Sequence, residues 1–377
     1  MITLPGLIDT HVHLREPGAT QKEDFETGTK AAIAGGYTCI LDMPNNPEPT
    51  ITPGALEKKM TLTQSVILNS FQDPQHKMPK QVRHDNMSSR IYCDVGFHFG
   101  ATSKSTQYFK QVKGKVFGLK VYMNHTTGTL LIEDKIILKD IFVRWPQDKV
   151  LMVHAEGPTL KKAIDLAGQF GNKLHVCHVS QASELSLIRQ AKQDNLSITC
   201  EVTCHHLFLT ENDQKTLGSF GIMRPPLATK TDQEALWTGI TDGTVDTIAS
   251  DHAPHTKEEK ANTPPPNGVP GLETTLPLLL TAISEGRLTV DKLIQLTNTN
   301  PRKIFNIPQQ FDSVVEVDPT RNYTLDARRL FTKCAWTPFE GKKVTGKIKR
   351  VVLNGKVVCK DGEVLNPPQG KVIYPTK

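Results

Sequence analysis

Two histidines near the start of the chain, His11 and His13, have the type and spacing of metal ligands. They end an apolar run within residues 6–16. In a β-strand, side chains at i and i+2 leave the same face, so both imidazoles would point to one side. Neutral imidazole is the commonest protein ligand for zinc. The pair alone is also compatible with two surface histidines, but other residues of the same chemistry recur along the chain.

Four further polar residues lie within or just after apolar stretches. Lys120 interrupts the apolar segment 118–122, and a buried ammonium is costly unless it is paired, neutralised or modified. His154, His178 and Asp251 each lie at the end of an apolar segment. Each could be an ordinary satisfied polar residue, but together with the His pair they indicate a metal centre.

The elements that carry these residues alternate between strand-like and helix-like segments. The strand-like segments are the first apolar run and residues 37–43, 91–99, 116–123, 150–154, 174–179, 198–203 and 247–250. Eight strands alternating with helices predict an α/β fold of the (β/α)8 barrel type, with the polar residues at the C-terminal ends of the strands. A doubly wound open sheet is disfavoured because no glycine-rich phosphate turn follows the first strand.

The remaining segments predict a small subdomain beside the barrel and an insertion. Residues 5–310 are expected to form the barrel, and residues 1–4 and 311–377 a small β subdomain with a hairpin around Asn354-Gly355. Residues 66–87, which include His76 and His84, are polar and interrupted by proline. We expect this insertion to lie away from the strand C-termini and from the chemistry.

Composition narrows the class of protein. The net charge of +6 comes from scattered basic residues, which argues against a nucleic-acid partner and suits a small anionic substrate. Seven cysteines, an odd number, indicate a reducing compartment rather than a disulfide framework. No signal peptide or bilayer-spanning run is visible, so we expect a cytoplasmic protein without a membrane partner.

On these motifs the chain resembles the metal-dependent amidohydrolases and, within them, the dihydroorotases, most closely the dihydroorotase domain of the animal multifunctional pyrimidine-synthesis protein. The resemblance runs from residue 4 to about 365, without the insertion. It implies a binuclear Zn²⁺ centre in which a CO₂-derived carbamate on the lysine bridges the metals. It also implies that Asp251 is catalytic and moves a proton to the leaving nitrogen. The implied ligands are His11, His13, Lys120, His154, His178 and Asp251.

The resemblance also implies a set of substrate contacts, because dihydroorotases carry His-Leu-Arg after the first strand and Met-Pro-Asn after the second. An arginine fork with an amide suits a carboxylate. Two positions depart from the family: Thr127 replaces the aromatic residue of animal sequences, and Cys204 replaces a proline. The implied substrate-binding residues are Arg15, Asn45, Thr126, Arg224, His255, Asn267 and Gly268.

The expected activity is the reversible cyclisation of N-carbamoyl-L-aspartate to L-dihydroorotate. Two alternatives remain: a related cyclic-amide hydrolase of the allantoinase or hydantoinase type, and a non-catalytic dihydroorotase-like scaffold. The resemblance further implies a homodimer and an association with aspartate transcarbamoylase.

A third zinc site is a separate prediction, formed by Cys177 and Glu201 with a ligand histidine such as His154. Cys177 neighbours His178, and Glu201 lies near the end of the adjacent strand. The alternative is that Cys177 packs as a small hydrophobe and Glu201 orients a metal-binding histidine.

Overall fold

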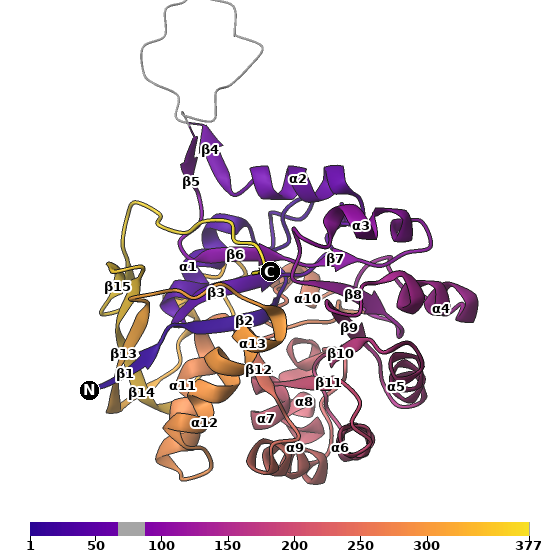
Figure 1. Cartoon of the computed structure of the whole chain (residues 1–377). Coiled ribbons are helices and arrows are strands. Elements are labelled where there is room, and N and C mark those ends of the chain that lie inside the picture. The colour runs from indigo at the N-terminus through magenta and orange to yellow at the C-terminus, as the bar shows by residue number, and fades with distance from the viewer. Residues whose placement is uncertain (67–86, 377) are drawn as a thin grey trace, which may run out of the picture.

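The computed structural model describes residues 1–66 and 87–376. A ring of parallel strands occupies its centre (Figure 1). One part of the ring has the order β2–β3–β6, and the other runs from β7 to β12 without a break. The bounds are β2 (Leu7–Val12), β3 (Tyr37–Asp42), β6 (Asp94–Phe97), β7 (Phe99–Gly100), β8 (Gly118–Tyr122), β9 (Val150–His154), β10 (Lys173–Val176), β11 (Ile198–Thr203) and β12 (Thr247–Ala249).

Two backbone contacts join the parts into a closed barrel. His98, which separates β6 from β7, donates its N–H to the carbonyl of Asp42. On the other side, Val12 forms a parallel bridge with His252, just after β12. Counting β6 and β7 as one interrupted strand gives eight strands in the described chain, so the predicted (β/α)8 fold class is confirmed.

Helices cover the outside of the ring, and local sequence explains their ends. Asp24 caps helix α1 (Phe25–Ala34) by accepting from the backbone N–H of Thr27. Helix α5 (Pro158–Phe170) ends at Gly171, which has the left-handed conformation. The longer helices are α1 (Phe25–Ala34), α2 (Pro53–Thr61), α4 (Lys135–Arg144), α5 (Pro158–Phe170), α6 (Ala182–Gln193), α9 (Lys230–Asp242) and α11 (Leu272–Ser284). Shorter ones are α3 (Phe109–Val112), α7 (Cys204–Phe208), α8 (Glu211–Leu217), α10 (Lys257–Lys260), α12 (Val290–Ile294) and α13 (Asn300–Phe305).

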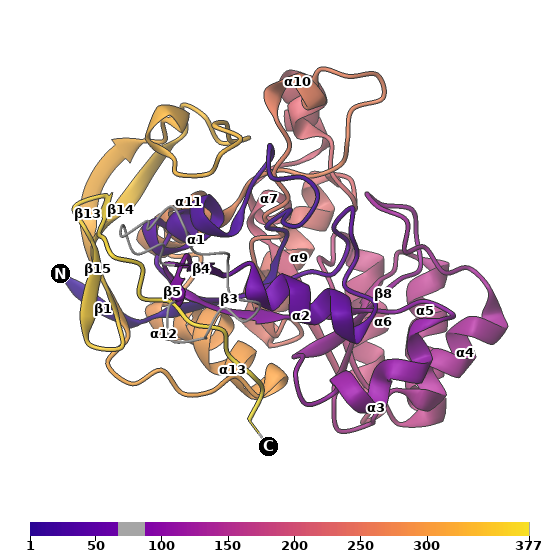
Figure 2. The same ribbon diagram turned by 90° about the horizontal axis from the view of Figure 1, so that it is seen from above.

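The first strand and residues 314–364 form an antiparallel sheet beside the barrel, on the side away from α4 and α5 (Figure 2), whereas Val372 near the C-terminus returns to pair with Val95 of β6. This confirms the small β subdomain, whereas its predicted boundary at residue 310 stays a prediction. Leu4, Val315 and Leu353 belong to the same buried core as the barrel strands. In order, the sheet contains β1 (Ile2–Pro5), β13 (Val314–Thr324), β14 (Lys343–Leu353), β15 (Lys356–Lys360) and β16 (Glu363–Val364).

The predicted insertion begins and ends in a short hairpin. β4 (Gln64–Val66) pairs antiparallel with β5 (Met87–Ser89). The residues between them, with His76 and His84, lie outside the described part of the chain. None of the described helices is both long and apolar enough to cross a bilayer.

Candidate active site

The predicted ligand residues meet at the C-terminal ends of the barrel strands. His11 and Lys120 lie within β2 and β8, and His154 is the last residue of β9. His178 and Asp251 follow β10 and β12 by two residues and have positive φ angles of 38° and 44°. Such strained backbone is concentrated at functional sites, and here it occurs where the chain leaves the barrel.

Two imidazoles converge on one carboxylate oxygen. The Nε2 atoms of His11 and His13 lie 3.3 Å and 3.2 Å from Oδ1 of Asp251. Burial lowers the pKa of His13 to about 3, so its ring is neutral. Burial opposes the charge of Asp251, but the neighbouring His11 holds its pKa below the usual range.

The other ring nitrogens of this pair have partners of their own. His11 Nδ1 donates to Oε1 of Glu201, and His13 Nδ1 donates to Oδ1 of Asn45 across 2.7 Å. In the neutral ring of His13, Nε2 is then an unprotonated lone pair facing a carboxylate oxygen. Two acceptors at this distance repel unless a cation lies between them, so the donor set fits a metal ion.

His154 and His178 add a second pair of nitrogens. Nδ1 of His154 lies 2.9 Å from Nε2 of His178, and Nδ1 of His178 is buried without a hydrogen-bond partner. Burial lowers the pKa of both rings, which keeps them neutral and able to bind metal. Ligand atoms of His11, His178 and Asp251 all lie within 4.8 Å of one another.

The surroundings of Lys120 suit a carboxylated lysine better than a free ammonium group. Its side chain is 0% exposed, and in the described chain no carboxylate lies within ion-pair distance. Its Nζ instead lies 2.9 Å from Sγ of Cys177, a thiol whose pKa burial raises. A buried charge without a counter-charge is costly, and a carbamate shared with metal removes that cost.

Glu201 is the buried hydrogen-bond acceptor that joins several residues of this cluster. Besides bonding to His11, its carboxylate accepts from His175 Nε2 at 3.2 Å and from the backbone N–H of His178 at 3.3 Å. Burial opposes its charge, but His11 and His175 hold its pKa well below the usual range. Glu201 and Cys177 form a metal-sized group with His11, whose ligand atoms lie within 4.8 Å of one another. The histidine in that group is His11 rather than His154.

The predicted substrate residues, with one exception, line a small cavity above the cluster. Asn45 donates its amide N–H to the carbonyl of Thr127 at 3.0 Å, and the hydroxyl of Thr127 donates to the carbonyl of Asn267 at 3.2 Å. Thr127 therefore links two loops across the mouth, through its backbone carbonyl on one side and its hydroxyl on the other. The lining residues among the predicted ones are Arg15, Asn45, Thr126, Arg224, Asn267 and Gly268.

The exception is His255, which is buried behind Arg15 and is not among the cavity residues. Its Nε2 lies 3.2 Å from Nη2 of Arg15, and its Nδ1 lies 3.3 Å from Oε2 of Glu259. Burial, then the charge of Arg15, lowers the pKa of His255, so its ring is neutral. Its Nε2 also lies 3.0 Å from the carbonyl oxygen of Asn267 and its Nδ1 3.3 Å from Nζ of Lys22, so the neutral ring can donate to Asn267 and accept from Lys22. Its direct contact with substrate stays a prediction, and its position suits orientation of Arg15.

Tyr122 and Lys260 are among the residues of the site that were absent from our sequence-based set. Tyr122 lines the cavity, and its place two residues after Lys120 in β8 was the available signal. Lys260 is 0% exposed and donates to the carbonyls of Ile222, Pro266 and Gly268 at 2.9, 2.9 and 3.2 Å. Its three bonds tie together the two loops that carry Arg224 and Asn267, which no local pattern predicts.

Comparisons with known proteins agree with this barrel and its cluster of metal-ligating side chains. Residues 2–69 match the model of the amidohydrolase family. An L-hydantoinase (dihydropyrimidinase) from Arthrobacter aurescens shares the fold, with a TM-score of 0.87 at 24% identity over 99% of this chain and 89% of that chain. An inactive dihydroorotase-like domain of a Chaetomium thermophilum CAD-like multifunctional protein has a TM-score of 0.79 and 27% identity, covering 99% of both chains.

Sequence relatives narrow the class to a family. The chain is 34% identical to the dihydroorotase of Pyrococcus furiosus over 99% of this chain and 85% of that protein. It is 43% identical to the multifunctional protein CAD of Squalus acanthias over 98% of this chain, but spans only 15% of that protein's length. A multifunctional protein of Dictyostelium discoideum is also matched over only 15% of its length. The chain belongs to the dihydroorotase family.

Proposed function

We propose that this chain is a dihydroorotase that interconverts N-carbamoyl-L-aspartate and L-dihydroorotate in de novo pyrimidine biosynthesis. The observation that carries the proposal is one cavity that contains both a complete metal-ligand set and an arginine with an asparagine, Arg15 and Asn45. A cyclic amide that bears a carboxylate needs both: a centre that activates water, and a cationic fork with an amide that orients the acid.

We assign the metal-binding roles to His11, His13, His154, His178, Asp251 and a carboxylated Lys120. Two zinc ions bound there would supply a Lewis acid and a water nucleophile near neutral pH. The unprotonated Nε2 of His13, which faces Asp251, and the buried Lys120 without a carboxylate partner in the described chain support this assignment. A third ion held by His11, Cys177 and Glu201 stays a prediction, and the alternative role of Glu201 is to fix the ring of His11.

In this proposal the protein's own groups divide the chemistry between proton transfer and orientation. In the hydrolytic direction, an Asp251 Oδ atom accepts a proton as water attacks the ring carbonyl, and returns it to the nitrogen as the C–N bond breaks. The low pKa of Asp251 keeps it ionised at neutral pH, so its oxygens are unprotonated when water attacks. The cyclisation uses the same steps in reverse, with release of water.

Recognition of the substrate rests on the loops around the cavity. Arg15, fixed by its Nε bond to the carbonyl of Pro254 at 3.0 Å, and Asn45 would bind the substrate carboxylate. Arg224 approaches from another loop. Backbone groups at Asn267 and Gly268 would contact the ring. Gly268 is required there, because its φ is 129° and a Cβ would lie 2.6 Å from the carbonyl oxygen of Ala253.

The proposal also covers the cellular compartment, the partner enzyme and the oligomeric state. The free, buried state of all seven cysteines supports a reducing, cytoplasmic environment. The match to segments of multifunctional proteins supports an association with aspartate transcarbamoylase, and a homodimer is expected.

A turnover assay with metal analysis tests the proposal. The purified chain should contain at least two zinc ions and hydrolyse L-dihydroorotate, with much lower kcat/KM for allantoin, hydantoin and dihydrouracil. Arg15→Met should abolish most of the preference for dihydroorotate while the metal content stays the same. Preference for an uncharged ring would instead favour the hydantoinase type, and a metal-loaded chain without turnover would favour a non-catalytic scaffold like the Chaetomium domain.

A further inference from the structure

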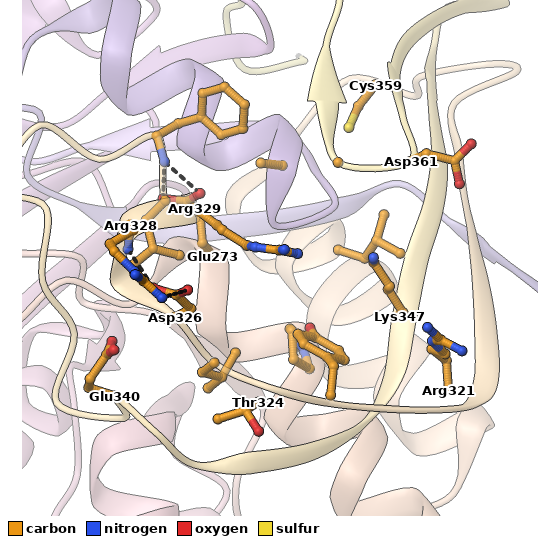
Figure 3. A pocket seen from close by; sticks show the side chains of 18 of the residues that line it. Glu273, Arg321, Thr324, Asp326, Arg328, Arg329, Glu340, Lys347, Cys359 and Asp361 are labelled. Atoms are coloured by element: carbon orange, nitrogen blue, oxygen red, sulfur yellow. Dashed lines mark hydrogen bonds and ion pairs between the residues drawn. The ribbon is translucent and has the colours of Figure 1, made fainter.

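A second cavity of about 820 Å³ lies outside the barrel mouth, between α11 and the β13–β14 pair of the small subdomain (Figure 3). Its lining shares no residue with the cavity above the metal ligands. The volume is in the usual range for small-molecule sites, and the proposed reaction makes no use of it.

Three cations face this cavity from two sides. Arg329 extends into it from the segment after β13, while Lys347 and Arg321 approach from the strands opposite (Figure 3). In the described part of the chain, none of the three has a carboxylate partner within ion-pair distance. A register shift in β13 between Asp318 and Asn322 removes Arg321 from regular pairing and directs the chain over the cavity.

The acidic residues of the lining offset these cations only in part, because each has another main partner or is uncharged. Asp326 is occupied by two bonds from Arg328, at 2.9 and 2.8 Å, and Asp361 is paired with Lys349. Burial raises the pKa of Glu273 to about 8, so it is largely uncharged at neutral pH.

Glu340 is the remaining acid, and it accepts from the backbone of Ala327 at 2.7 Å. With Glu273 uncharged, the lining has four cations (Arg321, Arg328, Arg329 and Lys347) against three carboxylates (Asp326, Glu340 and Asp361), and Lys349 pairs with the last of these from outside the lining. The site is therefore net positive, which suits an anionic ligand.

Part of the lining is apolar and aromatic. Tyr323 is half-buried, and Lys347 Nζ lies 6.0 Å from the centre of its ring. Half-buried Phe331 and the apolar side chains of Leu325 and Ile348 complete this face. Arginine and lysine bind phosphate groups, and an aromatic face accepts a planar base by stacking.

We propose that this cavity binds a nucleotide. Arg321, Arg329 and Lys347 hold its phosphates, and its base packs against Tyr323. Both requirements come from the lining itself, which brings an excess of positive charge next to an aromatic, apolar surface. The site is independent of the proposed hydrolase chemistry, so either can fail without the other.

Calorimetric titration of the metal-loaded full chain tests the proposal. The probes are ADP, GDP, CDP and UDP, with inorganic pyrophosphate and adenosine for comparison. At least one diphosphate should bind saturably and more tightly than pyrophosphate, and higher salt should weaken it. Absence of saturable binding by all four would overturn the proposal, and equal affinity for pyrophosphate would reject a nucleotide in favour of phosphate alone.

Variants locate the site. Arg321→Ala with Arg329→Ala, and separately Lys347→Met, should each raise the Kd at least about tenfold. Tyr323→Leu should weaken the diphosphate but not pyrophosphate. Arg144→Ala, an exposed arginine paired with Asp140 on α4, is the matched control and should change nothing. Unchanged binding in folded variants, checked by thermal melting, would place the nucleotide elsewhere and refute the proposal, and dihydroorotate turnover should be unaffected throughout.

Discussion

The two cavities of this protein differ in how far their charged side chains are buried and paired. At the barrel mouth, the charged and ligating groups are buried, and most have a fixed partner, as His11 has in Glu201. In the small subdomain, Arg321 and Arg329 are exposed and have no carboxylate partner in the described chain. Burial with fixed partners is what metal binding and proton transfer require, whereas exposed cations suit a ligand that arrives with its own charge.

Lys120 is the mouth residue that most resembles the cations of the other cavity, because it too lacks a carboxylate. Lys120→Ala should lower kcat/KM by at least about 10³-fold, since it removes the proposed bridge between metals that contribute several kcal/mol of transition-state stabilisation. Zinc content and turnover should fall together, and small carboxylic acids such as propionate should restore part of both. A variant with full zinc and activity would show that this lysine is only a buried cation.

A substitution of Asp251, which has a strained backbone just after β12, tests whether this carboxylate transfers the proton. Asp251→Asn should retain much of the metal through the remaining ligands but lose at least about 10² in kcat, the low end for a positioned acid–base group. Asp246→Asn is the matched control, because Asp246 lies just before β12 and pairs with Lys192. Near-wild-type turnover of Asp251→Asn would assign the proton transfer to another group.

The sequence predicted the fold class and which polar residues gather at the mouth, but not the partners of these residues, and the reason is physical. Ligands at strand ends are reported by local periodicity, because each strand brings its own terminal residue to the same rim. The partner of His11 is 190 residues away, so the bond between His11 and Glu201 has no local signature. The choice of His11 rather than His154 beside Cys177, and the bonds of Lys260, depend on the folded arrangement in the same way.

A substitution at Glu201 distinguishes two roles for its carboxylate: orienting the metal-binding His11, or binding a third ion directly. Glu201→Gln should lower zinc affinity about 10- to 100-fold, the usual cost of losing a carboxylate that orients a metal-bound histidine. Glu184→Gln is the matched control, since this buried carboxylate accepts backbone N–H groups of Ser180 and Gln181 at the start of α6. Anomalous scattering at the zinc edge then decides the rest: a third peak beside Cys177 supports the extra ion, and two peaks reject it.

Lys260 should affect substrate binding more than the chemical step. Lys260→Met removes the three bonds that join the loops of Arg224 and Asn267, so KM for dihydroorotate should rise about tenfold with kcat within a few fold. Lys257→Met, on the same short helix but exposed, should leave both unchanged. An equal loss in kcat would mean that the loops position the reacting groups as well.

The same residue predicts a pH dependence of stability. Burial lowers the pKa of Lys260 to about 8 from an ordinary 10.5, so its charged form destabilises the fold below pH 8. This cost is relieved as pH rises from about 8 to 10.5. The Tm difference between wild type and Lys260→Met should therefore shift in favour of wild type over that range, and parallel Tm curves would contradict the assignment.

The smallest effect is expected from the segment 67–86, which we predict to be dispensable to the chemistry. Val66 and Met87 are directly paired across the β4–β5 hairpin, so a two-residue Asn-Gly turn can replace the segment without moving either strand. The shortened chain should keep kcat/KM within about threefold, as expected for a polar insertion between elements.

Arg90→Ala sharpens this test, because Arg90 lies just beyond the hairpin and donates to Glu16 Oε1 at 3.2 Å and to the carbonyl of Leu62 at 2.8 Å. Glu16 adjoins Arg15, so loss of these bonds should disturb the mouth more than removal of the whole segment does. Steady-state kinetics on both variants compare them directly. A loss greater than about tenfold from the shortened chain alone would mean that the segment contacts the site or an essential interface, and its predicted remoteness from the chemistry would be wrong.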